Sequence, residues 1–332
     1  MPDRGRPVLE VRGLEATLTG RSGARVQAVR GVDFAVASGE CLGVVGESGS
    51  GKTVTLLALL GLLPETAHWS GEVRFEGRDL LALPDPVRRR ARGAGLGVVF
   101  QEPLSALNPV FSIGYQMMEP MRAHLGLTRR AAAARAAELL ELVGIPEQGA
   151  RLGDFPHQFS GGQLQRITIA MALACDPRVL IADEPTTALD VTVQAQILAL
   201  IRRLRAELGM AVIWVTHDLG VVATLADRVL VMYAGRVIEQ ATTAELLGDP
   251  QHPYTRGLLA AALAPRAPRP RRLRPIPGHP PAVAPARGCS FRPRCAEALA
   301  QCAAREPPRI VIGPRRDVAC FWDPATGGAR DG

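Results

Sequence analysis

Two kinds of hydrophobic pattern recur along the chain. Apolar and polar residues alternate in Val8–Leu18, Val26–Val36 and Gly71–Glu76, which is typical of half-exposed strands in an antiparallel sheet. Other segments are short, continuous apolar runs, typical of strands that are buried on both faces of a parallel sheet. These runs are Cys41–Val45, Val98–Phe100, Val179–Ala182 and Ala211–Val215.

Segments with helical periodicity lie between the apolar runs. They are Thr53–Leu62, Arg129–Val143, Gly161–Ala174 and Val193–Leu208. The alternation of short apolar runs with helical segments predicts an α/β core. The stretch that begins at Glu102 interrupts the alternation, and we interpret residues 102–165 as a helical subdomain. After Gly248 the composition changes to Pro, Arg and Ala. We therefore expect a main domain over residues 1–248 and an extension over residues 249–332.

Composition limits where such a chain can work. None of the apolar stretches reaches the 18 residues expected of a membrane-spanning helix, and no apolar segment follows the basic N-terminus, as a secretory signal would require. We therefore expect a cytosolic protein with reduced thiols. The net charge is +7, and nine arginines but no acids lie between Pro250 and Ala296. This basic tail is either simply solvated or directed at an acidic partner, a lipid headgroup surface or an anionic cluster.

A glycine-rich loop follows the first apolar run. It reads Gly46-Glu47-Ser48-Gly49-Ser50-Gly51-Lys52-Thr53, which fits the pattern G-x-x-x-x-G-K-[ST]. Such a loop wraps phosphates with backbone N–H groups, and the following helix directs its positive end at them. We expect Lys52 to neutralise the β- and γ-phosphates and the Thr53 hydroxyl to bind Mg²⁺.

Polar side chains follow three other apolar runs. Asp183 and Glu184 follow one, Gln101 another and His217 a third. Ligands of parallel α/β sheets bind beyond the carboxyl ends of the strands, so these side chains are expected near one nucleotide. Asp183 is suited to hold Mg²⁺ and Glu184 to polarise the attacking water as general base.

One more motif makes the set recognisable. Phe159-Ser160-Gly161-Gly162-Gln163 stands before a helical pattern, and Ala188-Leu189-Asp190 follows the acidic pair. With the phosphate loop, Gln101 and His217, these motifs resemble the ATP-binding cassette of ABC transporters over roughly residues 8–248. The resemblance implies a P-loop NTPase fold, with a parallel-sheet core, an antiparallel β subdomain and a helical subdomain.

The resemblance also implies how the site residues act. Two cassettes stack head to tail, and each ATP lies between the phosphate loop of one and the serine-glycine signature of the other. Ser160, Gly161, Gly162 and Gln163 would contact the partner's γ-phosphate, and Asp190 would lie at the dimer seam. Gln101 would link the nucleotide and its Mg²⁺ to the helical subdomain, and His217 would contact the γ-phosphate.

Further motifs resemble the dipeptide and oligopeptide importers. They are Val45–Leu63, Gln158–Ile197, Asp249–Leu259, Pro275–Gly278 and Gly288–Cys295. In that class, the cassette pairs with a second homologous ATPase subunit and with two permease subunits, and a solute-binding protein outside the cytoplasm delivers the cargo. The chain would then be a peripheral protein on the cytoplasmic face of the bacterial membrane.

Other functions fit less well. A related cassette can serve nickel or another small solute. A soluble ABC ATPase of DNA repair would carry a long coiled coil after Gln101, and a ribosomal one would carry two cassettes. A regulatory module without turnover would not need Glu184 and His217. The arginine-rich tail has few aromatic residues, so we do not expect it to bind nucleic acid.

The sequence departs from the family at two positions. The signature begins with Phe159 where Leu is usual, an apolar replacement that we expect to be tolerated. The family usually stacks an aromatic side chain on adenine near residue 18, where this chain has Leu18. We therefore expect weaker discrimination between ATP and GTP.

Four cysteines gather near the C-terminus. Cys289, Cys295, Cys302 and Cys320 follow a C-x5-C-x6-C-x17-C spacing. Zinc ribbons favour C-x2-C pairs, so zinc fits poorly, whereas iron–sulfur clusters accept more varied spacings of four thiolates. Some members of the importer class carry a [4Fe–4S] cluster on such cysteines. A flexible tail with four free thiols is the other interpretation.

Overall fold

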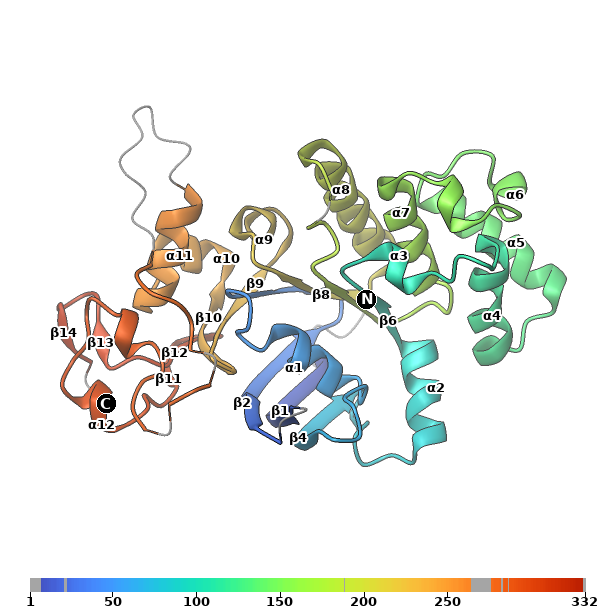
Figure 1. The fold of residues 1–332 in the computed structure, drawn as a ribbon. Helices are drawn as coiled ribbons and strands as arrows, with labels where there is room; N and C mark the ends of the chain where they lie inside the picture. The colour runs from blue at the N-terminus through green and yellow to red at the C-terminus, as the bar shows by residue number, and fades with distance from the viewer. Residues whose placement is uncertain are drawn as a thin grey trace. The chain divides into compact units, whose positions relative to one another are not determined.

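The chain divides into two compact units, each drawn from separate parts of the sequence (Figure 1). The structure is a computed structural model that describes residues 7–20, 23–187, 189–263, 276–281, 283–285 and 287–330. The first unit comprises Met1–Leu9, Val36–Glu40 and Arg74–Trp214, and the second comprises Glu10–Ala35, Cys41–Val73 and Val215–Gly332. Pro275 of the importer motif and Ala188 lie outside the described residues.

The alternating segments form an antiparallel sheet. Its strands are β1 (Pro7–Thr19), β2 (Arg25–Ala37), β4 (His68–Phe75) and β5 (Arg78–Asp79), in the order β2-β1-β4-β5. In β1, Val11, Leu14 and Ala16 are buried while Glu15 is exposed, which confirms the predicted alternation. Gly71 has φ 110°, and a Cβ there would lie 2.6 Å from the carbonyl oxygen of Gly13, so this close strand crossing requires glycine.

The second unit contains most of a mixed sheet. Its strands are β3 (Cys41–Val45), β9 (Arg228–Tyr233), β10 (Arg236–Thr242), β11 (Ile310–Gly313) and β12 (Arg316–Val318). These strands lie in the order β11-β12-β10-β9-β3. β3 runs parallel to β9, whereas the pairs β9–β10, β10–β12 and β12–β11 are antiparallel. The sequence predicts β3 but neither β9 nor β10. The C-terminal strands β11 and β12 thus extend the sheet of this unit.

Short helices complete the second unit. They are α1 (Lys52–Leu59), α9 (Leu219–Leu225), α10 (Thr243–Gly248), α11 (Pro253–Leu263) and α12 (Gln301–Ala304). A 3₁₀ turn, Arg292–Arg294, and the hairpin of β13 (Trp322–Asp323) and β14 (Gly328–Ala329) lie in the C-terminal segment. Tyr254 of α11 and Phe291 belong to the same buried cluster as Val231 and Tyr233 of β9. The boundary near residue 248 remains a prediction.

The first unit holds the buried strands β6 (Leu96–Val99), β7 (Val179–Asp183) and most of β8 (Ala211–Thr216), in the order β8-β7-β6. β6 runs parallel to β7, and Val99 lies opposite Ala182. These strands confirm the predicted parallel core. β6 ends before Phe100, which is 41% exposed, so the prediction that Phe100 lies in this buried strand is wrong.

Helices fill the segment between β6 and β7, where the sequence predicts them. The helices of the first unit are α2 (Asp85–Gly95), α3 (Pro103–Ala106), α4 (Ile113–Leu125), α5 (Arg129–Leu142), α6 (Gln148–Arg151), α7 (Gly161–Ala172) and α8 (Val191–Leu208). Figure 1 shows α4, α5 and α7 as one group. Met117, Leu139 and Ile167, one from each of these helices, are buried.

Candidate functional site

The phosphate loop connects β3 to α1 in the second unit. Gly51 caps α1 with φ 100°, and a Cβ at this residue would lie 2.5 Å from the carbonyl oxygen of Ala28. The loop therefore packs too closely for any other residue. Thr53 is exposed in the first turn of α1, where a helix presents its positive end.

Lys52 lies across this loop. Its Nζ donates to the carbonyl oxygens of Gly46 and Glu47, at 2.8 and 3.1 Å, and the residue is 5% exposed. The ammonium group is thus held against the main chain of the loop, the part that the sequence assigns to phosphates. The Lys52 ammonium group and the exposed Thr53 residue therefore both belong to the second unit.

His217 also belongs to the second unit. It follows β8 directly and is exposed. The next residue, Asp218, caps α9 by accepting the N–H groups of Gly220 and Val221 at 2.7 and 3.4 Å. This cap fixes where the strand ends and the helix begins, and so fixes the backbone that carries His217.

The acidic pair ends β7 in the first unit. Asp183 is 6% exposed, and Glu184 has φ 46°, a conformation that costs energy for a residue other than glycine and often marks a functional site. The hydroxyl of Thr187 donates to Oε2 of Glu184 at 3.1 Å. β6 and β7 are parallel neighbours with Val99 opposite Ala182. Gln101 therefore lies at the same edge of the sheet as Asp183 and Glu184.

The signature begins α7 in the same unit. The hydroxyl of Ser160 accepts the N–H of Gln163 at 3.4 Å, and the side chain of Gln163 accepts the N–H of Ser160 at 3.0 Å. This capping box leaves Ser160 and Gly161 exposed at the positive end of a helix. Phe159 is buried under the guanidinium of Arg151, 5.1 Å from its ring centre.

Asp190 caps the next helix, α8, in a similar way. One carboxylate oxygen accepts the N–H groups of Thr192 and Val193 at 3.0 and 2.9 Å. The helix that it caps lies against the signature, since a Cβ on Gly162 would come within 2.8 Å of the Val193 side chain. The exposed Asp190 and the signature are therefore brought together on the first unit.

The four C-terminal cysteines influence one another electrostatically. Burial, together with the charges of Cys289, Cys295 and Cys302, raises the pKa of Cys320 to about 12. Burial also raises the pKa of Cys295 to about 11, with contributions from Cys289 and Cys302. The N–H of Cys289 donates to the carbonyl of Cys302 at 2.8 Å. Yet no group of three His, Cys, Asp or Glu side chains that could hold a metal ion occurs among the described residues.

Sequence reasoning missed two residues that contact the phosphate loop. Tyr254 and Arg294 lie more than 200 positions after the loop and bond to Glu47 at 2.9 Å and at 2.6 and 3.0 Å. Both residues lie in segments that resemble the peptide importers, but no periodicity indicates what those segments touch.

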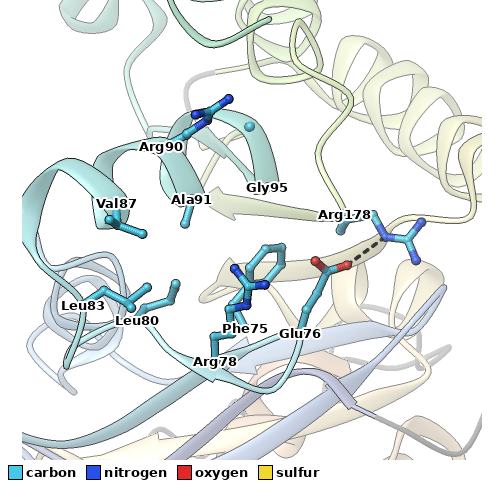
Figure 2. A pocket seen from close by; sticks show the side chains of 11 residues that line it. Phe75, Glu76, Arg78, Leu80, Leu83, Val87, Arg90, Ala91, Gly95 and Arg178 are labelled. Carbon is cyan, nitrogen blue, oxygen red and sulfur yellow. Dashed lines mark ion pairs between the residues drawn. The ribbon is translucent and has the colours of Figure 1, made fainter.

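A hollow of about 460 Å³ lies beside α2 in the first unit (Figure 2). Its wall includes an ion pair of 3.6 Å between Arg178 and Glu76. The remaining lining side chains are those of Phe75, Arg78, Leu80, Leu83, Val87, Arg90, Ala91 and Ala94, with Gly95. None of the predicted nucleotide residues lines this hollow.

An apolar surface follows Gln101 in the first unit. Four large apolar side chains of this segment are at least 43% exposed: Leu104, Val110, Phe111 and Tyr115. The rings of Phe111 and Tyr115 stack with centres 4.8 Å apart. Exposed apolar side chains in one segment make it a candidate surface for contact with another protein. We name these four residues the apolar patch.

In the parts of the chain that the structure describes, every helix is too short or too polar to cross a lipid bilayer.

Two family models match the chain. The first, "ABC transporter", matches residues 29–187, and the second, "Oligopeptide/dipeptide transporter, C-terminal region", matches residues 238–302. The two matches follow one another along the sequence without overlap, and the second lies mostly beyond β10.

Individual relatives match over most of the chain. A peptide import ATP-binding protein of Brucella melitensis is 46% identical over 95% of this chain and 97% of its own length. The oligopeptide transport ATP-binding protein OppD of Bacillus subtilis is 47% identical over 92% of this chain and 86% of its own length. The OppD protein of Mycobacterium tuberculosis is 48% identical, but the chain spans only 52% of that protein.

A solved structure has the same fold. A dimeric ATP-binding cassette bound to ADP and phosphate superposes with a TM-score of 0.62 at 28% identity, over 71% of this chain and 98% of that one.

Proposed function

Because the chain belongs to the ABC transporter family, we propose that it binds and hydrolyses ATP to energise the import of dipeptides and oligopeptides through separate permease subunits. The match of residues 238–302 to the C-terminal region of oligopeptide and dipeptide transporters carries this proposal, because it separates these importers from the wider family. Relatives named for peptide import at 46% and 47% identity favour peptides over nickel or another solute.

The phosphate loop binds the triphosphate. Lys52 neutralises its charge, and the N–H groups at the start of α1 hold its oxygens. Thr53, Asp183 and Gln101 offer a hydroxyl, a carboxylate and an amide oxygen, the hard ligands that Mg²⁺ takes. When bound, Mg²⁺ neutralises charge that develops on the phosphates.

Glu184 takes a proton from the attacking water. Thr187 holds one of its carboxylate oxygens, which orients the group for its role as general base. His217 contacts the γ-phosphate and stabilises the charge of the transition state.

A second cassette completes each ATP site. The exposed start of α7, with Ser160, Gly161, Gly162 and Gln163, forms an anion site that suits the γ-phosphate held by another subunit. Asp190, which lies beside the signature, faces that subunit at the seam. The neighbour of known structure is a dimeric cassette, which supports this arrangement. We propose a second, homologous subunit as the partner, so that the pair is a heterodimer.

The apolar patch docks the permease. It follows Gln101 directly, so a change at the nucleotide can reach the permease through a short piece of chain. Two permease subunits and a solute-binding protein outside the membrane complete the importer, and this chain is peripheral on the cytoplasmic face. ATP closes the two cassettes and hydrolysis through Glu184 resets them.

We also propose that Cys289, Cys295, Cys302 and Cys320 hold a [4Fe–4S] cluster. The charges of Cys289, Cys295 and Cys302 all act on Cys320, and those of Cys289 and Cys302 act on Cys295, which supports it. No group of three side chains placed to hold a metal ion occurs among the described residues. A cluster binds its four thiolates on separate irons, so the C-x5-C-x6-C-x17-C spacing of the cysteines carries this proposal. When bound, it would supply a rigid cross-link for the segment. Charge-transfer absorbance and iron content after anaerobic purification test this, and a colourless, iron-free protein contradicts it.

The proposed function is tested with the full-length protein and its cognate partner subunit. We expect saturable Mg–ATP binding and ATP hydrolysis, and a drop in affinity of about tenfold or more in Lys52→Ala because a charge-assisted contact is lost. Uptake of a labelled peptide, measured beside uptake of nickel in a deletion strain, separates the cargoes. Absence of Mg–ATP binding by the unaltered pair would overturn the proposal.

A further inference from the structure

An acidic residue lies within the anion-binding loop, and a distant arginine pairs with it. The guanidinium of Arg294 meets the carboxylate of Glu47 in two contacts, Nη1 to Oε2 at 2.6 Å and Nη2 to Oε1 at 3.0 Å. The side chain of Arg294 is 4% exposed and that of Glu47 is 29% exposed. This two-pronged geometry is the strongest form of a protein ion pair.

Arg294 is itself held from several sides. Its Nε donates to the carbonyl of Pro277 at 2.8 Å, and its Nη1 reaches the hydroxyl of Tyr233 at 3.4 Å. A guanidinium stays protonated in proteins at any ordinary pH, so the charge of Arg294 is permanent. The residue ends the 3₁₀ turn Arg292–Arg294 and directly precedes Cys295, which places this cation in the cysteine-rich segment.

A second residue of the C-terminal segment holds the backbone at the same point. The N–H of Glu47 donates to Oη of Tyr254 at 2.9 Å, and Tyr254 is fully buried. The rings of Tyr233 and Phe291 pack around it, with centres 4.7 and 5.4 Å away. The carboxylate and the backbone N–H of Glu47 therefore both bond to residues that follow β9.

The segment around the turn Arg292–Arg294 is also bound to strands β2 and β10. Glu306 forms ion pairs with Arg30 of β2 at 2.7 Å and with Arg236 of β10 at 3.1 Å. Ser290, which lies just before the turn, bonds to both Arg30 and Glu306, at 3.2 and 3.4 Å. Ser290 therefore connects the start of the turn to Arg30 and Glu306.

A carboxylate in this loop needs such a partner. Triphosphate binding brings several negative charges to the loop, and an unpaired Glu47 would repel them. The carbonyl of Glu47 also accepts from Lys52 at 3.1 Å, so a displaced Glu47 would alter the setting of that lysine as well.

We propose that Arg294 is a positioning residue for ATP binding: it neutralises Glu47 and, with Tyr254, holds the first half of the phosphate loop in its phosphate-binding shape. This inference rests on the proposed ATP site and adds a role for the C-terminal segment in it. When only a fraction of the molecules has the competent loop, the apparent Kd rises by the inverse of that fraction.

The test measures equilibrium Mg–ATP binding of full-length variants together with their partner subunit. If the phosphate loop of Arg294→Met has its ATP-binding shape in about a tenth of the molecules, the Kd for ATP rises about tenfold. We also expect KM to change more than kcat. Arg294→Lys keeps the charge but loses the two-pronged contact, and should lie between Arg294→Met and the unaltered protein. Arg292→Met is the matched control, because Arg292 lies in the same turn and is exposed; it should bind ATP normally.

A double variant separates positioning from mere stability. Glu47→Gln removes the charge that Arg294 neutralises, so Arg294→Met with Glu47→Gln should recover most of the affinity that Arg294→Met loses. A purely structural role predicts no such recovery. Normal ATP affinity in Arg294→Met, or a double variant no better than the single one, overturns the inference while ATP binding by the unaltered pair still stands. If Arg294→Met does not fold, Arg294→Gln, which also lacks the cation, gives the same comparison with and without Glu47→Gln.

Discussion

The Nδ1 atom of His252 accepts the backbone N–H of Tyr254 at 3.0 Å. The ring is almost fully buried, and burial lowers the pKa of His252 to about 3. A protonated imidazole has no acceptor and could not make this bond. The backbone N–H of His252 donates to the buried carboxylate of Glu239 at 2.8 Å. Neutral His252 therefore sets the start of α11 and, with it, Tyr254 beside the phosphate loop.

This bond predicts a loss of stability in mild acid. The pKa of His252 in the folded protein lies below the ordinary value of 6.5. The stabilising contribution of the neutral ring is therefore complete above pH 6.5 and is lost progressively as the pH falls from there to the folded pKa. The free energy of unfolding should fall by at most about 1.4 kcal/mol per pH unit from this group. Urea unfolding between pH 7.5 and 4.5 measures it.

His252→Asn provides the comparison, because it keeps an acceptor but does not titrate in this range. It should show a shallower pH dependence than the unaltered protein, whereas His279→Asn, at an exposed position, should follow the unaltered profile. If His252→Asn and the unaltered protein lose stability in parallel, the buried neutral histidine is not the cause.

Leu18 is expected to weaken base selection. It lies half-buried near the end of β1, where the family usually places an aromatic side chain. Leu18→Tyr should raise the ratio of ATP to GTP affinity about fivefold, since a stacking contact is worth about 1 kcal/mol. Competition binding with the two nucleotides measures the ratio. Leu18→Met adds no ring and should leave it unchanged, and an unchanged ratio in Leu18→Tyr refutes the expectation.

The apolar patch is expected to hold the permease. Phe111→Ser removes a ring that stacks on Tyr115, and loss of a central aromatic contact weakens an interface by about 2 kcal/mol or more, about thirtyfold. Co-purification with the permease should fall, while ATP binding by the subunit stays normal. Leu208→Ser changes an equally exposed side chain at the end of α8 and should have no effect. Normal assembly of Phe111→Ser would assign the patch another role.

Local signals in the sequence identify most of the candidate site residues in each unit. The buried strands β3 and β7 are short apolar runs, and each is followed by the residues that carry the proposed chemistry. The capping box of Ser160 and Gln163 is also local, because both partners lie within one turn of helix. Patterns of this range are set by the backbone period, so a single sequence reveals them.

The contacts of the C-terminal segment could not be predicted in this way. The pairing of β12 with β10 and the contact of Arg294 with Glu47 join residues that are distant in sequence, and nothing in the local period specifies such partners. Phe100 shows the opposite error: an apolar run predicts a strand, but the strand ends one residue earlier and leaves the ring exposed.

Glu184→Gln is expected to separate ATP binding from hydrolysis. The amide has the shape of the carboxylate and can still receive the hydroxyl of Thr187, but it cannot take a proton from water. A general base typically contributes about 10²–10⁴-fold, so turnover should fall by that factor while ATP affinity stays normal. The variant should then accumulate as an ATP-bound dimer, visible by size-exclusion chromatography. Glu207→Gln, at a half-exposed position of α8, should hydrolyse ATP normally. Hydrolysis at the ordinary rate by Glu184→Gln would show that another group accepts the proton.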